Sequence, residues 1–201
     1  MLLLLPLLSL ISIVSLGSAY STLSDDTLKS LPSPGDEFDI KKGKILAPIL
    51  QERVSGTPGS TAVLEHFVDF FKTHLPKWNL EFHNSSSTTP TSNGKKVPFI
   101  NLIATRDPPN TGVGEVGRLT LVAHYDSKLT PKGFIGATDS AAPCAMLLHA
   151  ARTLDAALTK KWESPDGLDD LDEVKGVQIL LLDGEEAFHS WTDTDSLYGS
   201  R

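Results

Sequence analysis

The architecture of this chain can be predicted from one segment, Val177-Gln178-Ile179-Leu180-Leu181-Leu182-Asp183-Gly184-Glu185-Glu186-Ala187-Phe188. Its first half is a continuous apolar run, which is typical of a strand buried on both faces of a sheet. Its second half places three carboxylates where that strand must end, and ligands of open α/β sheets bind beyond the carboxyl ends of the strands. One such carboxylate can hold a cation while its neighbour moves protons. The alternative is a solvated acidic turn, since charged residues are mostly exposed.

Two polar clusters upstream favour the site over the solvated turn. Residues 118–123 are predicted as a strand that ends in His124 and Asp126, and Asp139 lies in the loop before a helix predicted to extend to about residue 160. Strand, loop, helix, loop and strand form a βαβ unit, and its right-handed crossover brings the ends of the two strands together. Histidine, aspartate and glutamate side chains at one edge form a nitrogen and oxygen donor set that suits zinc.

The remaining elements complete an α/β class. A helix is predicted for residues 60–75, and strands are predicted for residues 80–83 and 97–104, on either side of a polar hairpin loop at residues 84–96. The sheet therefore begins antiparallel and continues parallel. The apolar positions expected to face the core are Val63, Phe67, Phe70, Phe71 and Leu75 in the first helix and Met146, Leu147, Ala150, Leu154 and Leu158 in the second.

Length and composition indicate one globular domain. The chain has 201 residues, of which 40% are hydrophobic and 21% are charged, and these are ordinary globular values. The net charge of −7 and the lack of a basic stripe argue against a nucleic-acid partner. The single cysteine, Cys144, excludes an internal disulfide and is expected to be buried.

Residues 1–19 have the features of a cleaved signal peptide, with an apolar run followed by the small residues Gly17-Ser18-Ala19. The run is short for a bilayer-spanning helix, which needs about 20 residues. We therefore expect a secreted protein whose single domain comprises residues 20–201 and which has no stable membrane association after cleavage. The alternative is a signal anchor in the ER or Golgi. The sequon Asn84-Ser85-Ser86 is a candidate glycosylation site in the predicted loop.

Five pieces of the chain, in this order, resemble one enzyme family: residues 53–60, 124–128, 136–144, 183–191 and 195–201. The family is that of the zinc-dependent glutaminyl-peptide cyclotransferases, or glutaminyl cyclases, which share a fold with the co-catalytic zinc aminopeptidases. The resemblance implies a mixed central β-sheet with helices on both faces. It also implies an enzyme that converts the N-terminal glutamine of peptides or proteins to pyroglutamate with release of ammonia.

The resemblance also implies roles for individual residues. Asp139 and Glu186 look like ligands of a zinc ion, with one per chain expected in the full-length enzyme, and Glu185 looks like the acid/base that transfers protons. Trp191 looks like a wall of the substrate pocket.

Three further residues are expected to support the site from behind or to be structural. His124 and Asp126 match the His-x-Asp of the two-metal aminopeptidases, where the histidine holds the other zinc. In the cyclases, which look like one-metal enzymes, that histidine is usually not a ligand. Asp183 is the third residue that is expected to support the site from behind or to be structural.

Two departures from the family pattern affect the expectation. Ala123 stands where some relatives have a cysteine that pairs with the counterpart of Cys144. The family's third zinc ligand is a histidine on a later loop, and nothing in this chain matches it. The chain is therefore expected to be an N-terminal fragment that lacks the C-terminal part of the domain and is inactive by itself.

Two alternatives to the cyclotransferase remain: a secreted two-zinc aminopeptidase, and an inactive truncated product. Residues 138–141 and 188–191 look like the cyclase variant rather than the aminopeptidase one.

Overall fold

The computed structural model of this protein describes residues 22–164 and 174–201. The chain divides into two compact units, Met1–Ser33 and Pro34–Arg201. In the first unit, the side chain of Ser24 caps the short helix α1 (Asp25–Lys29) by accepting a hydrogen bond from the Thr27 N–H. The predicted signal peptide and most of the acidic loop before the last strand lie outside the described residues.

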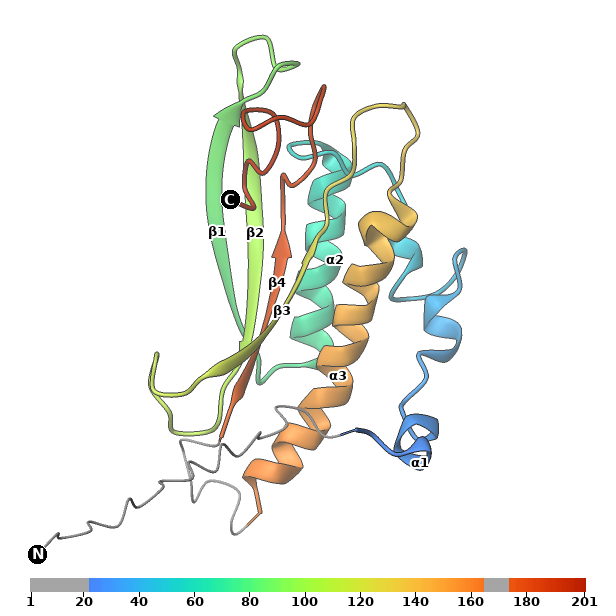
Figure 1. Cartoon of the computed structure of the whole chain (residues 1–201), viewed down its shortest axis with the longest axis vertical. Coiled ribbons are helices and arrows are strands. Elements are labelled where there is room, and N and C mark those ends of the chain that lie inside the picture. The colour runs from blue at the N-terminus through green and yellow to red at the C-terminus, as the bar shows by residue number, and fades with distance from the viewer. Residues whose placement is uncertain (1–21, 165–173) are drawn as a thin grey trace, which may run out of the picture. The chain divides into compact units, whose positions relative to one another are not determined.

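The second unit is built on a four-stranded mixed sheet with the strand order β1-β2-β4-β3 (Figure 1). The strands are β1 (Asn79–Thr88), β2 (Lys96–Arg106), β3 (Arg118–His124) and β4 (Gly176–Leu182). β1 pairs antiparallel with β2, β2 pairs antiparallel with β4, and β4 pairs parallel with β3. The predicted α/β class, with an antiparallel start and a parallel continuation, is confirmed.

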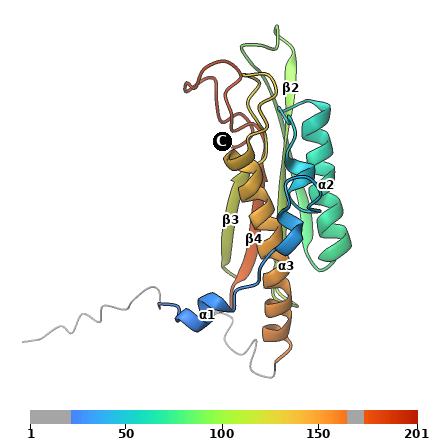
Figure 2. The same ribbon diagram turned by 90° about the vertical axis from the view of Figure 1, so that its right-hand side faces the viewer.

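Two long helices, α2 (Pro58–His74) and α3 (Ala142–Trp162), lie on the same side of the sheet (Figure 1 and Figure 2). Thr57 caps α2, and Pro58 occupies its first turn, where a missing N–H costs nothing. Short turns at η1 (Gly35–Phe38), η2 (Ala47–Ile49) and η3 (Ala137–Ala141) precede the two helices. Within the described residues the helices cover one face of the sheet, whereas cover on both faces was expected.

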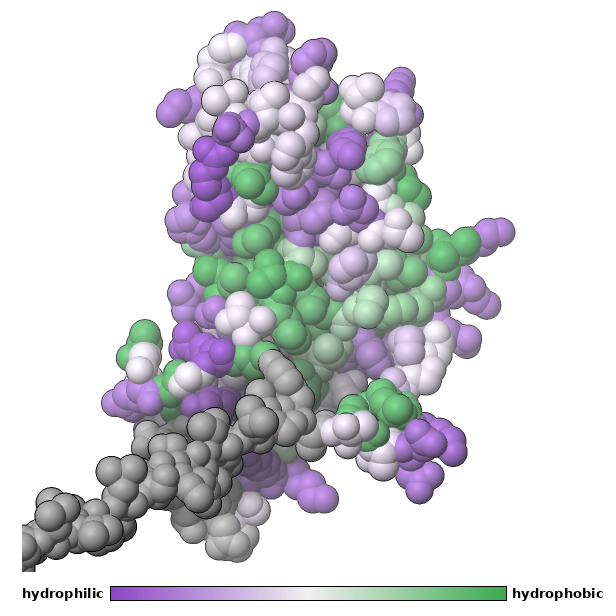
Figure 3. All heavy atoms as spheres, viewed as in Figure 1, coloured by the Kyte–Doolittle hydropathy of each residue, from purple (hydrophilic) through white to green (hydrophobic). Residues whose placement is uncertain are grey.

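β4 shows the same asymmetry. Val177, Ile179 and Leu181 are buried, whereas the alternate positions Gln178, Leu180 and Leu182 are only half-buried. Successive strand residues point to opposite faces, so among the described residues the strand buries one face fully and the other only in part. Figure 3 shows hydrophobic side chains gathered around the middle of the molecule, and the strand residues among the exposed large apolar side chains are Phe82 of β1 and Leu119 and Val122 of β3.

The predicted hairpin loop is shorter than expected. β1 continues to Thr88 and β2 begins at Lys96, so that only residues 89–95 form the loop. The sequon residue Asn84 therefore lies on β1, paired with Ile100, and is exposed. The polar composition predicted a loop because polar residues are depleted in strands, but β1 is an edge strand whose side chains can face water.

The core-facing side of α3 follows the prediction in part. Leu147, Leu154 and Leu158 pack half-buried against the core, as predicted, whereas Met146 is 59% exposed. The fully buried positions are Cys144, Ala145, Leu148, Ala151 and Trp162. The helix begins at Ala142, and its small residues allow close packing against the sheet. The predicted burial of Cys144 is confirmed, and its thiol, whose pKa burial raises to about 12, donates to the His124 carbonyl oxygen at 3.2 Å.

Candidate active site

The ends of the parallel strands β3 and β4 carry the candidate site. His124 pairs with Leu182 in the parallel register, so the polar residues that follow each strand start from neighbouring points. Tyr125 extends the pairing, since its N–H donates to the Leu182 carbonyl oxygen at 2.7 Å. The predicted meeting of the two strand ends at one edge is thus what the fold produces.

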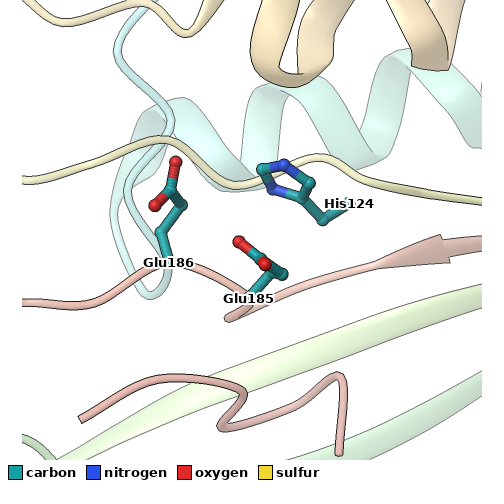
Figure 4. Close-up of side chains that lie close together, drawn as sticks. All are labelled: His124, Glu185 and Glu186. Carbon is teal, nitrogen blue, oxygen red and sulfur yellow. The ribbon is translucent and has the colours of Figure 1, made fainter. Parts of the chain in front are cut away.

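Three of the predicted residues form a compact group (Figure 4). One ligand atom from each of His124, Glu185 and Glu186 lies within 4.8 Å of the other two. The imidazole comes from the end of β3 and both carboxylates come from the turn after β4. The side chain of His124 is only 12% exposed, and Glu186 is buried.

A buried carboxylate, that of Asp126, holds this group in place. Its two oxygens accept the backbone N–H groups of Glu185 at 3.0 Å and Glu186 at 2.9 Å. One of them also lies 3.3 Å from Nδ1 of His124. A single side chain at the end of β3 therefore orients residues from both strands, and only 2% of it is exposed.

Asp183 faces away from the group and joins the turn to the sheet. Its carboxylate accepts hydrogen bonds from the Ser55 hydroxyl at 2.6 Å and from the Ile100 N–H at 3.0 Å. Its own N–H donates to the Asn101 side chain at 2.8 Å. Burial raises the pKa of Asp183 to about 6. These contacts are those of a residue that fixes the backbone rather than one that meets a ligand.

Asp139 lies beside the group. Its side chain is 67% exposed, and Oδ1 is 2.9 Å from Nε2 of His124. Burial lowers the pKa of His124, but hydrogen bonds to Asp126 and Asp139 and the charge of Glu185 outweigh burial and raise it to about 9. The imidazole is then cationic at neutral pH and offsets part of the repulsion among the carboxylates.

The donor set suits a zinc ion. Burial raises the pKa values of Glu185 and Glu186. Oε2 of Glu186 is 3.7 Å from the Lys128 ammonium, but its Oε1 is buried and has no hydrogen-bond partner in the described part of the chain. An unpartnered buried carboxylate oxygen is costly, and a cation would satisfy it. Carboxylates are ligands that zinc accepts, and an imidazole is one only after it has lost its second proton.

The expected pocket wall, Trp191, is 57% exposed. It lines an open hollow of about 250 Å³ together with Lys128, Thr130 and the segment from Ala187 to Ser190. Lys128 and Ala187 connect this hollow to Glu186. The roles of Trp191 in binding, of Asp139 and Glu186 in ligation and of Glu185 in proton transfer stay predictions.

The structure adds supporting residues that the patterns alone did not assign. Arg53 is fully buried, and its guanidinium donates to the carbonyl oxygens of Ile135 and, at 3.0 Å, Gly136. It thereby holds the segment that leads to Asp139. The turn cluster around Arg53 was visible in the sequence, but no spacing indicated that a cation there would bind backbone carbonyls.

Carboxylates and a histidine gather at the parallel strand ends of a mixed sheet, the arrangement of an α/β protein with a candidate metal site. The chain belongs to peptidase family M28, whose model matches residues 101–201.

Similarity to individual proteins narrows the comparison. The chain is 41% identical over 160 residues to the glutaminyl-peptide cyclotransferase of Bos taurus, which covers 78% of this chain and 41% of that protein. It is 40% identical over 163 residues to the glutaminyl-peptide cyclotransferase of Gloydius blomhoffii, covering 78% and 41% of the two chains. The crystal structure of the Macrostomum lignano glutaminyl cyclase superposes with a TM-score of 0.64 at 31% identity, covering 87% of this chain and 45% of that one.

A Zn-dependent exopeptidase from Parabacteroides distasonis shares the fold, with a TM-score of 0.54 at 18% identity, covering 84% of this chain and 54% of that one. The chain spans about two fifths of the length of the curated relatives it matches. Within residues 22–164 and 174–201, no helix combines the length and the apolar character needed to cross a bilayer.

Proposed function

We propose that this chain carries the catalytic residues of a zinc-dependent glutaminyl-peptide cyclotransferase. The substrates would be peptides or proteins with an N-terminal glutamine, and the products pyroglutamyl peptides and ammonia. The observation that carries the proposal is the convergence of His124, Glu185 and Glu186 at the strand ends, in a chain 41% identical to the bovine glutaminyl-peptide cyclotransferase.

The reaction needs no nucleophile from the protein. The α-amine of the substrate attacks its own side-chain carboxamide carbon, a C–N bond forms within the ring, and the bond to the amide nitrogen breaks. Glu185 accepts a proton from the attacking amine and returns it to the leaving nitrogen, which departs as ammonia. Its raised pKa, caused first by burial, suits a group that must both take and give a proton. Zinc, when bound, would supply Lewis-acid polarisation of the carboxamide oxygen.

We further propose one zinc ion per chain, with Asp139 and Glu186 as ligands. Lys128 lies 3.7 Å from Glu186 and balances part of its charge. Asp126 fixes the backbone of both glutamates by accepting hydrogen bonds from their N–H groups. Asp139 and Glu186 are two protein ligands, fewer than the three that are usual for catalytic zinc, so the count of one zinc ion refers to the full-length enzyme.

The test gives the zinc-loaded protein a peptide that begins with glutamine and measures free ammonia and the peptide product. Two forms are compared: this chain alone, and this chain joined to the C-terminal remainder of the bovine relative. We expect the joined form to release ammonia and produce a pyroglutamyl peptide, and a chelator to abolish this activity. Release of the first amino acid without ammonia would replace the proposal with a peptidase.

We also propose that the protein enters the secretory pathway and is glycosylated at Asn84. The supporting observations are the signal-like residues 1–19 and the exposure of Asn84 on the edge strand β1. Expression in mammalian cells should yield a protein in the medium whose mass falls after N-glycosidase treatment. The variant Asn84→Gln should have the lower mass from the start, and an unchanged mass would exclude the modification.

A further inference from the structure

The carboxylate of Asp195 is surrounded by hydrogen-bond donors from a single loop. One oxygen accepts the Phe188 N–H at 3.0 Å, and the other accepts the N–H groups of His189 at 2.9 Å and Ser190 at 2.8 Å. The Tyr198 hydroxyl donates to the first oxygen at 2.7 Å. Asp195 is only 4% exposed, so these contacts are shielded from water.

In the described part of the chain, the carboxylate of Asp195 is bonded by four donors. A protonated carboxyl group would need an acceptor for its own hydrogen, so this arrangement favours the ionised form. Burial raises the pKa of Asp195, but the hydrogen bonds from Ser190, Tyr198, Phe188 and His189 outweigh burial and bring it below its ordinary value. Hydrogen bonds to a charged acceptor are about twice as strong as neutral ones. An asparagine at this position has only one acceptor oxygen. It could not accept hydrogen bonds both from Phe188 and Tyr198 and from His189 and Ser190.

The same segment is anchored to the sheet through Tyr198. Its ring stacks on Phe99 of β2, with centroids 5.2 Å apart and planes 3° from parallel. It also packs edge-on against the ring of Phe188, with the two ring centroids 5.5 Å apart. The hydroxyl of this ring is the one that donates to Asp195, so the carboxylate is tied to the sheet as well as to the loop.

Two backbone contacts join the segment to the turn that carries the glutamates. The N–H of Leu197 donates to the Glu185 carbonyl oxygen at 3.0 Å, and the N–H of Tyr198 donates to the Gly184 carbonyl oxygen at 2.6 Å. Residues 195–198 thus contact both the turn after β4 and the loop that leads to Trp191.

We propose that Asp195 is a positioning residue that fixes the loop 188–191 beside the candidate active site and so sets the wall of the hollow that receives the substrate. The proposal rests on the proposed function for the identity of the substrate, a peptide that begins with glutamine. It concerns neither metal ligation nor proton transfer, because Asp195 touches neither the imidazole nor the glutamate side chains.

The experiment measures amide hydrogen exchange in this chain and in the variant Asp195→Asn. We expect exchange at residues 188–190 to accelerate about tenfold or more, because a charge-accepting partner of three N–H groups is lost. Exchange in β4 and α3 should stay within about twofold of the original, since these elements do not contact the carboxylate.

Asp193→Asn is the matched control. Asp193 is an exposed aspartate two positions away, and the same substitution there should leave exchange at residues 188–190 unchanged. Tyr198→Phe removes only the hydroxyl and should give a smaller acceleration than Asp195→Asn.

Two further measurements separate this proposal from the proposed function. Both are made on the form joined to the bovine remainder. Zinc affinity should be the same with and without Asp195→Asn. The dissociation constant of a glutaminyl peptide, followed by tryptophan fluorescence, should rise about fivefold or more in Asp195→Asn, because a mobile wall binds less well. If the joined form with Asp195 intact binds no such peptide, the proposed function fails while the exchange result still decides the role of Asp195.

Unchanged exchange at residues 188–190 in Asp195→Asn would overturn the proposal. It would also be overturned by an acceleration that extends equally through β4 and α3, because Asp195 would then stabilise the fold as a whole rather than position one loop.

Discussion

Asp126 shows how one side chain can organise a site built from two strands. It lies two residues after the end of β3, yet both of its oxygens bind the turn after β4. Because it also contacts Nδ1 of His124, it leaves Nε2 of that ring turned toward Asp139. Asp126 therefore determines which ring nitrogen of His124 faces Asp139, although Asp126 is not a member of the compact group.

The two neighbouring glutamates should differ in what they do. In the form joined to the bovine remainder, Glu185→Gln should lower turnover about a hundred- to ten-thousand-fold, the range for a lost acid/base group, with little loss of zinc. Glu186→Gln should weaken zinc retention, because it replaces the buried carboxylate whose Oε1 lacks a partner. Turnover and bound zinc are measured on both variants, and interchanged effects would show that the two roles are reversed.

His66 should make stability sensitive to acid. Burial lowers its pKa from the ordinary 6.5, although a hydrogen bond to the Ile45 carbonyl oxygen and the charge of Asp69 act against burial. Below pH 6.5 the unfolded chain therefore binds the proton first, and the free energy of unfolding falls until the pH passes the folded pKa.

Urea unfolding of the original chain and of His66→Gln on both sides of this pH window checks the effect. The loss on acidification should be smaller in His66→Gln than in the original, and His83→Gln, at an exposed position on β1, should behave like the original. Equal losses in all three proteins would mean that His66 contributes nothing to the acid response.

The two faces of β4 give a matched pair of substitutions. Leu181 is fully buried against the helices, and its neighbour Leu180 is half-buried on the opposite face. Leu181→Ala should lower the free energy of unfolding by about 2–5 kcal/mol, the range for a buried leucine. Leu180→Ala should cost clearly less. Equal costs, measured by urea unfolding, would show that both faces of the strand are covered.

Much of the framework could be predicted because it follows from periodicity and topology. The apolar run of β4, the helical spacing in α2 and the βαβ unit each fix an element by a repeated pattern. Once those elements were placed, His124 and Glu185 had to start from neighbouring strand ends. The site was therefore predictable to the extent that it depends on strand order.

The misplaced features depend on contacts that no local pattern records. β1 runs through polar residues because pairing with β2 satisfies its backbone, whatever its side chains prefer. Met146 is exposed because the rotation of α3 follows the small residues Cys144 and Ala151, which fit closely against the sheet. The hydrogen bond from Ser55 to Asp183 joins positions far apart in the sequence, so only the folded chain reveals it.

The protein as a whole carries an excess of acid, and the candidate site concentrates it. The net charge is −7, and Asp126, Asp139, Glu185 and Glu186 all surround one imidazole. A zinc ion would relieve this repulsion in the folded chain only, since the unfolded chain does not bring the donors together. Free zinc at about 100 times its dissociation constant should raise the free energy of unfolding by about 2.7 kcal/mol. Thermal unfolding with and without zinc checks this, and Glu186→Gln should show a smaller rise.

The most direct measurement is the zinc content of the form joined to the bovine remainder after chelator treatment and dialysis against zinc. We expect one zinc ion per chain, and markedly less in Glu186→Gln under the same conditions. Two zinc ions per chain would contradict the account and point to the two-metal peptidases. Zinc binding that is unchanged by Glu186→Gln would contradict it as well, because the metal would then lie outside the group at the ends of β3 and β4.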